Sequence, residues 1–142
     1  MAFDIYDNAY FSYNTNNLSA YIESIELSAE RELQDDTTMG DTTRSNIAGL
    51  KNWTFTVNFK QDVAASALDS IIWPLFDAGA THALEFRTDA GSASASNPKW
   101  TGNGLISQYT PATGSVGDVK MASMTVVPAK GSGSAALTRA TL

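Results

Sequence analysis

The chain has 142 residues, the length of one ordinary domain, and it contains no cysteine and a single histidine. The missing cysteines exclude disulfides, zinc–thiolate centres, iron–sulfur clusters and thiol catalysis. Fifteen acidic residues against nine basic residues give a net charge of −6. Because DNA-binding domains owe most of their affinity to basic residues that neutralise phosphates, this charge argues against a DNA-binding domain. It is compatible with a wall along which DNA slides.

The first residues, Met1 to Asp4, lack the cationic region and the apolar run of a signal peptide, and no stretch approaches the roughly 18 apolar residues of a membrane-spanning helix. We therefore expect no membrane association. Residues 1–19 place aromatic side chains among Asn and Asp without a regular strand pattern. They form either a first strand with a loop, or an N-terminal arm whose aromatics are buried against a neighbouring subunit. The apolar side chains of this segment are Phe3, Ile5, Tyr6, Tyr10, Phe11 and Tyr13.

A predicted strand and a predicted long loop follow. Residues 20–28 are rich in β-branched and aromatic residues, which favours a strand. Residues 29–48 are nearly all polar and predict one long loop, either solvated or folded against a partner. Its acids could supply oxygen ligands for Ca²⁺, but they lack the spacing and the central glycine of an EF-hand loop, so we expect no metal site. These acids are Glu30, Glu32, Asp35, Asp36 and Asp41.

The clearest pattern covers residues 50–60, where large apolar and polar residues alternate as in a half-buried strand. A shift of one residue would expose three aromatics, so the register is firmly set. From Asp62 the apolar spacing changes to three and four, which predicts a helix over 62–78 with Asp62 as N-cap, Pro74 in its last turn and Gly79 at its end. The strand face and the helix stripe are predicted to form the core: Trp53, Phe55, Val57 and Phe59 with Leu68, Ile71, Ile72 and Leu75.

The remaining chain predicts more strands and a flexible tail. In the strand over 81–89, Leu84 and Phe86 alternate with Glu85 and Arg87, which therefore face away from the core. The order of strands, one helix and further strands indicates an α+β, mostly β fold: an antiparallel β-sandwich or barrel with one flanking α-helix, in a single domain over 1–142. Further strands are predicted at 99–109 and 119–127, loops at 90–98 and 110–118, and a flexible C-terminal tail at 129–142.

No constellation of reactive side chains emerges from the sequence. His82 lies inside a predicted strand, where a lone histidine is more often a sheet residue than a base or a ligand. Gly114 and Gly117 lack the lysine and the following helix of a phosphate-binding loop. No pair of carboxylates is placed for acid–base catalysis. We therefore expect no enzymatic activity, no catalytic residue and no cofactor.

Several stretches resemble the tail tube proteins, or major tail proteins, of long-tailed, non-contractile bacteriophages (siphophages), mostly those that infect actinobacteria. The most specific stretch is DDTTMGDTTR at 35–44, because composition alone would not generate it. The resemblance runs from about residue 18 to residue 128. The other stretches are LSAYIESIEL at 18–27, IAGLKNW at 47–53, FKQD at 59–62, LEFR at 84–87, NPKWTG at 97–102 and GSVGDV at 114–119.

This resemblance implies a structural virion protein that is assembled in the host cytoplasm. Such proteins form hexameric rings that stack into a tube around a tape measure protein, closed by tail terminator and tip proteins. Double-stranded DNA later passes through the lumen without specific binding. Strands of each subunit join a continuous inner β-barrel with the helix outside, and the long loop 29–48 reaches the next ring. No C-terminal immunoglobulin-like domain is expected.

The resemblance also directs attention to two sets of residues. Because phosphate contacts repeated along a tube would retain DNA, the lumen is expected to carry acids from the polar faces of strands, with any base paired. The lumen-facing candidates are Glu23, Glu26 and Glu85, with Arg87 as a partner for Glu85 or for an acid on a neighbour. The expected inter-ring or inter-subunit contacts are Glu30, Arg31, Glu32, Asp35, Asp36, Met39, Asp41 and Arg44.

Two alternative functions remain open at this point. One is the tube protein of a contractile tail or of a secretion-type tube, which is similar in fold. The other is a small β-sandwich module that binds a receptor or a carbohydrate, with Trp53, Trp100 and the tyrosines as a platform for sugar rings. Both tryptophans are predicted to face inward, which argues against the platform.

Overall fold

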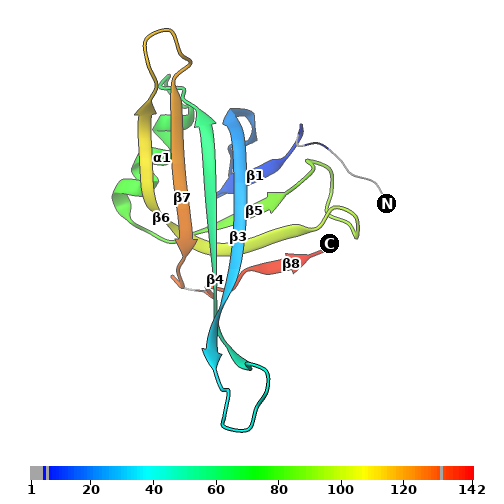
Figure 1. The fold of residues 1–142 in the computed structure, drawn as a ribbon. Coiled ribbons are helices and arrows are strands. Elements are labelled where there is room, and N and C mark those ends of the chain that lie inside the picture. Colours follow the sequence, from blue (N-terminus) through cyan, green and yellow to red (C-terminus); the bar gives the residue numbers. More distant parts are fainter. Residues whose placement is uncertain (1–4, 6, 132) are drawn as a thin grey trace.

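The fold is a mostly antiparallel β-sheet with a single α-helix, seen in a computed structural model that describes residues 5, 7–131 and 133–142 (Figure 1). The strands lie side by side in the order β2-β1-β5-β6-β7-β4-β3, and β8 pairs with β6. The elements are β1 (Tyr10–Tyr13), β2 (Asn16–Asn17), a 3₁₀ turn (Ser19–Tyr21), β3 (Ile22–Asp35), β4 (Asn46–Lys60), α1 (Leu68–Ala78), β5 (His82–Arg87), β6 (Lys99–Thr113), β7 (Met121–Pro128) and β8 (Thr138–Ala140).

Strand β6 belongs to two parts of the sheet. Its residues 99–104 pair with β5, and its residues 104–113 pair with β7. Between these parts, Gly104 leaves no room for a side chain, because a Cβ there would lie 2.6 Å from the Val127 carbonyl oxygen. The Tyr13 hydroxyl donates a hydrogen bond of 3.0 Å to the Gly104 carbonyl oxygen, which ties β1 to this point. Because Gly104 has no side chain, the two parts of the sheet can meet at this residue and pack on a common core.

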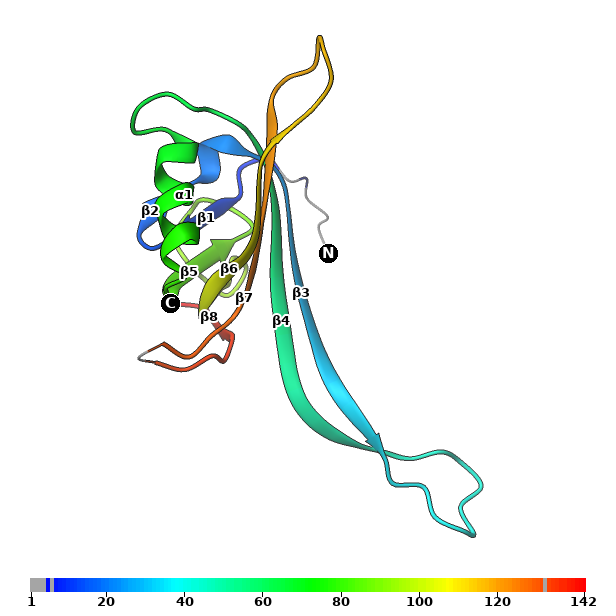
Figure 2. The ribbon, with the colours of Figure 1, turned by 90° about the vertical axis from the view of Figure 1, so that its left-hand side faces the viewer.

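The core lies between the two parts of the sheet and under the helix. Phe55 of β4 contacts Phe11 of β1 and Phe86 of β5, with ring centroids 5.7 Å apart in both pairs. Figure 2 shows α1, β1 and β5 on the same side of the long strands. The predicted alternation in β4 is confirmed, because its buried side chains are Trp53, Phe55, Val57 and Phe59. In α1 the side chains of Leu68 and Ile72 are buried, and those of Ile71 and Leu75 are half-buried.

The prediction of one long loop over 29–48 is wrong for most of its length. Strand β3 continues to Asp35 and β4 begins at Asn46, so that only residues 36–45 connect them. The paired strands form an arm that extends well beyond the body (Figure 2). Both faces of this ribbon are exposed, so its sequence lacks the apolar alternation that indicates a strand. Cross-strand backbone pairing needs no such alternation.

The helix begins later than the sequence indicates. Asp62 does not cap it; its carboxylate accepts a 3.0 Å hydrogen bond from the Ala64 N–H within a separate turn. Ser66 has a φ of 62°, which breaks any helical run before Ala67. The N-cap is Ala67, and the helix ends, as predicted, at Gly79 with a left-handed φ of 65°.

At the N-terminal end the first of the two predicted alternatives, a strand with a loop, is present, whereas the C-terminal end differs from its predicted form. Strand β1 pairs with β5, so Phe11 and Tyr13 belong to this chain's own core and not to an arm buried by a neighbour. Phe3 and Tyr6 lie outside the described residues. In the segment predicted as a flexible tail, β8 pairs with β6, and Trp53 Nε1 donates a hydrogen bond of 2.8 Å to the Ala135 carbonyl oxygen. The Gly- and Ser-rich composition conceals this short strand.

The other predicted strands are present with shifted boundaries. Those over 81–89, 99–109 and 119–127 correspond to β5, β6 and β7. Strand β6 runs on to Thr113 through Pro111, a residue that disfavours a strand in sequence analysis. Strand β7 begins only at Met121, so Val119 stands in the loop before it, 61% exposed.

Replacing Phe55 by Ala should lower the free energy of unfolding by about 3–5 kcal/mol, because it removes a fully buried ring that contacts both parts of the sheet. Urea unfolding monitored by circular dichroism measures the change. The control is Thr56→Ala on the opposite, exposed face of the same strand, with an expected loss below about 1 kcal/mol. Equal unfolding midpoints for the two variants would contradict this assignment of the core.

Candidate assembly surfaces

The acids of the arm are held by local hydrogen bonds and do not converge. Asp41 accepts a hydrogen bond of 2.9 Å from the Thr38 N–H. Asp35 accepts one of 2.9 Å from the Thr37 N–H and pairs with Arg44 at 3.0 Å. The hydrogen bonds from Thr37, with Arg44 next to them, lower the pKa of the Asp35 carboxyl. Among the described residues no group of three or more His, Cys, Asp or Glu side chains could hold a metal ion.

Within the described part of the chain, no helix is long and apolar enough to cross a bilayer.

The sheet has two open edges that belong to one four-stranded unit. Strand β3 is fourteen residues long and ends the strand order, with β4 as its partner on one side. At the other edge, β6 beyond Gly104 pairs with β7 alone among the described strands. Three successive antiparallel pairings separate β6 from β3, so the two edge strands run in opposite directions. Long open edges expose unpaired N–H and C=O groups that can pair with another chain.

The face of this unit opposite the core is polar. Residues paired across strands share one face, so the register aligns Glu26, Thr56, Thr125 and Gln108 in a single row. In Figure 2 the described helix and short strands all lie on the other side. We call the following residues the polar face: Ser24, Glu26, Ser28 and Glu30 of β3, Asn52, Thr54, Thr56 and Asn58 of β4, Ser123 and Thr125 of β7, and Gln108 and Thr110 of β6.

The structure brings only part of the expected lumen acids together. Glu26 lies on the polar face, and Glu23 is exposed at the register shift between Ile22 and Ser24. Glu85 lies on β5, in the other part of the sheet, and is half-buried. Its carboxylate oxygens lie 3.9 Å from a nitrogen of Arg87 and 3.9 Å from that of Lys99. The expected pairing of Glu85 with Arg87 is present, but Glu85 is remote from the polar face.

The tip of the arm is an ordered turn. Thr37 Oγ1 accepts a hydrogen bond of 2.8 Å from the Ser45 N–H, and the Asp36 N–H donates one of 3.1 Å to the Ser45 carbonyl oxygen. Gly40 has a φ of 97°, a conformation that a residue with a side chain rarely adopts. The DDTTMGDTTR stretch therefore builds this tip.

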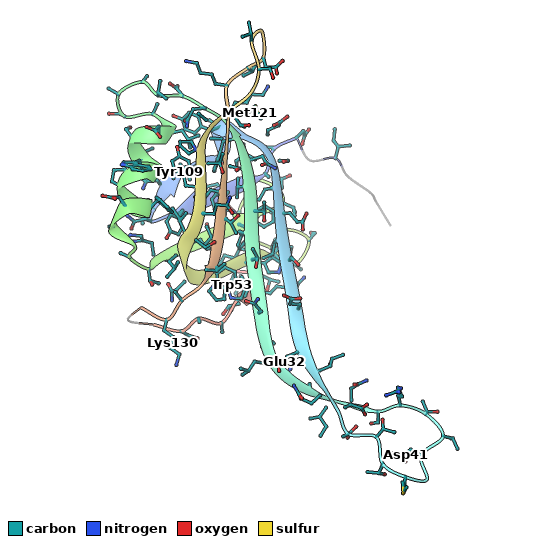
Figure 3. All side chains as sticks on the ribbon, turned by 60° about the vertical axis from the view of Figure 1, so that its left-hand side comes forward. Glu32, Asp41, Trp53, Tyr109, Met121 and Lys130 are labelled. Atoms are coloured by element: carbon teal, nitrogen blue, oxygen red, sulfur yellow. The ribbon has the colours of Figure 1, made fainter. Side chains whose placement is uncertain are left out.

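The arm carries large apolar side chains that its own chain does not cover. Leu50 is 80% exposed and Met39 fully exposed, and Leu33 and Ile47 are more than half exposed. Figure 3 shows the arm from Glu32 to Asp41 projecting away from the body. Every residue expected at inter-ring or inter-subunit contacts is exposed and lies on this arm: Glu30, Arg31, Glu32, Asp35, Asp36, Met39, Asp41 and Arg44.

Sequence reasoning missed two further exposed apolar sites. One surrounds a groove of about 620 Å³ beside the β6–β7 loop, whose exposed members include Val63, Val116 and Val119. This end of the long strands lies opposite the arm (Figure 1). The other is Trp73 on α1, which is 47% exposed. The sequence could have indicated this site, because Trp73 is an aromatic residue that lies outside the apolar stripe of its helix.

Comparison with known proteins finds likeness in fold alone. The sequence matches no protein-family model and no curated protein. A chain of the virion of a native gene transfer agent particle is 14% identical and superposes with a TM-score of 0.68, covering 91% of this chain and 94% of that one. A chain from the tail of an empty gene transfer agent particle, determined with C6 symmetry, is 16% identical, with a TM-score of 0.65 over 83% and 81%.

A third similar structure comes from another kind of particle. A chain of the anti-feeding prophage baseplate, determined with six-fold symmetry, is 13% identical and has a TM-score of 0.61, covering 89% of this chain and 92% of that one. These superpositions over most of each chain show a shared fold, which in this chain is the predicted mostly antiparallel β-sheet with a single helix.

Proposed function

We propose that this chain is a structural virion protein, not an enzyme, whose copies form stacked hexameric rings that make the tube of a phage or phage-like tail. The observation that carries the proposal is the likeness in fold to a chain of a tail determined with C6 symmetry. The open edges, the arm and the polar face of our chain each supply one feature that such a tube needs.

Ring closure requires that the sheet continue from one copy to the next. Because β3 and the free part of β6 run in opposite directions, β3 of one copy can extend the antiparallel sheet at β6 of its neighbour. Repetition around a six-fold axis closes the sheet into one barrel. Closure pairs the exposed N–H and C=O groups of both edges.

Stacking requires a head-to-tail contact between rings, which produces an open filament. The arm projects along the direction of the long strands, and its apolar side chains would be covered by the adjacent ring (Figure 2). The exposed valines beside the β6–β7 loop lie at the other end of the same strands. Burial of Leu50 and Met39 on assembly would contribute about 1.5–3 kcal/mol for each side chain fully removed from water.

The polar face would line the lumen and let DNA pass. Most side chains on this face are hydroxyls and amides without charge, and Glu26 and Glu30 repel phosphates. Lys60, which follows Asn58 on the same side of β4, adds a base at the end of the face. Glu23, at the edge of the face, adds to this charge. A tape measure protein would occupy the lumen before the DNA, and tail terminator and tip proteins would close the ends. The protein would be assembled in the host cytoplasm and reside in the virion.

The siphophage type of tail follows from the sequence resemblance, whereas the baseplate neighbour favours a contractile or secretion-type tube as the second candidate. A carbohydrate-binding platform has less support. Trp53 is only 4% exposed, and its N–H is bonded to the Ala135 carbonyl oxygen. Trp100 is half-buried, with its ring centroid 5.9 Å from that of Phe86.

Purified protein should form rings and tubes that are visible by negative-stain electron microscopy. Replacing Leu50 and Met39 together by Ser should leave the free energy of unfolding within about 1 kcal/mol, because both side chains are exposed in the free subunit. The same variant should lose tubes and retain single rings or monomers. Leu142→Ser, which changes an equally exposed residue at the chain terminus, is the control and should form tubes.

Wild-type protein that stays monomeric at high concentration, also with its tape measure protein present, would contradict the proposed function. Tubes of normal length from the double variant would contradict only the stacking role of the arm.

Glu26→Lys should give particles that assemble but eject DNA slowly, because each ring would then contact phosphates. The defect should diminish as salt is raised, since phosphate contacts release counterions. The matched control, Glu26→Gln, removes charge without adding a base and should eject DNA at close to the normal rate. Normal ejection by the lysine variant at low salt would show that the polar face does not face DNA.

A further inference from the structure

Trp73 is an aromatic side chain of α1 that its own chain covers only in part. Its ring lies 5.8 Å from that of Phe76 and 6.4 Å from that of Tyr109, measured between centroids, and 47% of it is exposed. Tyr109 is fixed in turn, because its hydroxyl donates a hydrogen bond of 2.7 Å to Asp69 and accepts one of 3.0 Å from Gln61. The indole therefore packs against Tyr109, which lies in the free part of β6.

The opposite edge of the same unit carries a cavity of about 360 Å³, a volume typical of sites that hold small molecules. Its lining includes Ala20 of the 3₁₀ turn and Ile22 and Ile25 at the start of β3. Asp7 and Glu23 also line it and provide carboxylate oxygens. An indole needs an acceptor for its N–H when it is buried, and these carboxylates supply one.

The register places the tryptophan and the cavity at the same level of the sheet. Tyr109 pairs with Met124, Met124 with Val57, and Val57 with Ile25, so these four residues form one row across the unit on its core side. Trp73 packs against the first residue of this row, and the cavity is lined by the last. A second copy that adds its β3 to the free part of β6 therefore brings its cavity edge toward Trp73.

We propose that Trp73 inserts into this cavity of the neighbouring copy within a ring, with its N–H directed to Asp7 of that copy. The proposal rests on the proposed function, because it needs the ring. The cavity is filled by a second copy of this chain, because Trp73 and the cavity lie at opposite edges of the four-stranded unit and at the two ends of the same row of paired residues. Such a contact is heterologous, as ring closure requires. A tryptophan that fills a pocket is typical of residues that dominate interface energies.

Cross-linking tests the contact directly, because the natural chain has no cysteine. A chain with both Trp73→Cys and Ala20→Cys, assembled and treated with a short bis-maleimide, should give a ladder of covalent oligomers up to the full ring. Each single-cysteine chain should give none. A ladder that forms equally well with a single cysteine, or its absence from assembled double-cysteine chains, would overturn the proposal.

Assembly energetics provide the second test. Trp73→Ala should raise the protein concentration needed for rings by about 30-fold or more, and Trp73→Phe by less, while the monomer stays folded. Ala20→Phe fills the cavity from an exposed position and should have the same effect as Trp73→Ala. Tubes from all variants at the wild-type concentration would refute the Trp73 contact and leave the proposed function intact. Failure of the wild-type chain to assemble would instead refute the proposed function.

Discussion

The open edge of β3 is the constraint on which the other features depend. Its fourteen residues include one entire side of N–H and C=O groups that no described strand pairs. A soluble protein usually protects such an edge with charges, proline or a covering segment. Strand β3 carries charges such as Glu26 and Arg31, and β6 carries Pro111, yet no described strand covers either edge. Here the opposite edge of the same unit, on β6, is also open and runs in the direction that an antiparallel partner needs. A closed assembly of several copies satisfies both edges at once.

The chemistry of the long strands follows from this arrangement. The core side of β4 must be apolar, because it packs on the helix and on the other part of the sheet, and Phe55 and Phe59 are fully buried there. The other side faces no described element, so hydroxyl and amide residues occupy it. Beyond Trp53 the hairpin leaves the body and both faces are exposed, yet Leu50 and Met39 remain apolar. Exposed apolar residues of this kind are expected on a surface that another copy covers.

The sequence predicts a strand well where one face of that strand is buried and poorly where neither face is buried. The alternation of Phe55 and Val57 with threonines reports a half-buried strand, and Gly79 reports the end of a helix. The arm was missed because both faces of its strands are polar or exposed, and β8 was missed because pairing of Thr138 with Thr101 leaves no apolar pattern. The cavity near Ile25 depends on contacts between distant segments, which periodicity does not show.

Backbone amide hydrogen exchange along β3, measured residue by residue in the monomer and in the assembled tube, tests the central claim most directly. If β3 of one copy pairs with β6 of the next, alternate amides of residues 22–31, those directed away from β4, should exchange readily in the monomer and become strongly protected in the tube. Amides of β4 residues 55–60, already paired on both sides by β3 and β7, should change little. Unchanged exchange along β3 in tubes would contradict the account.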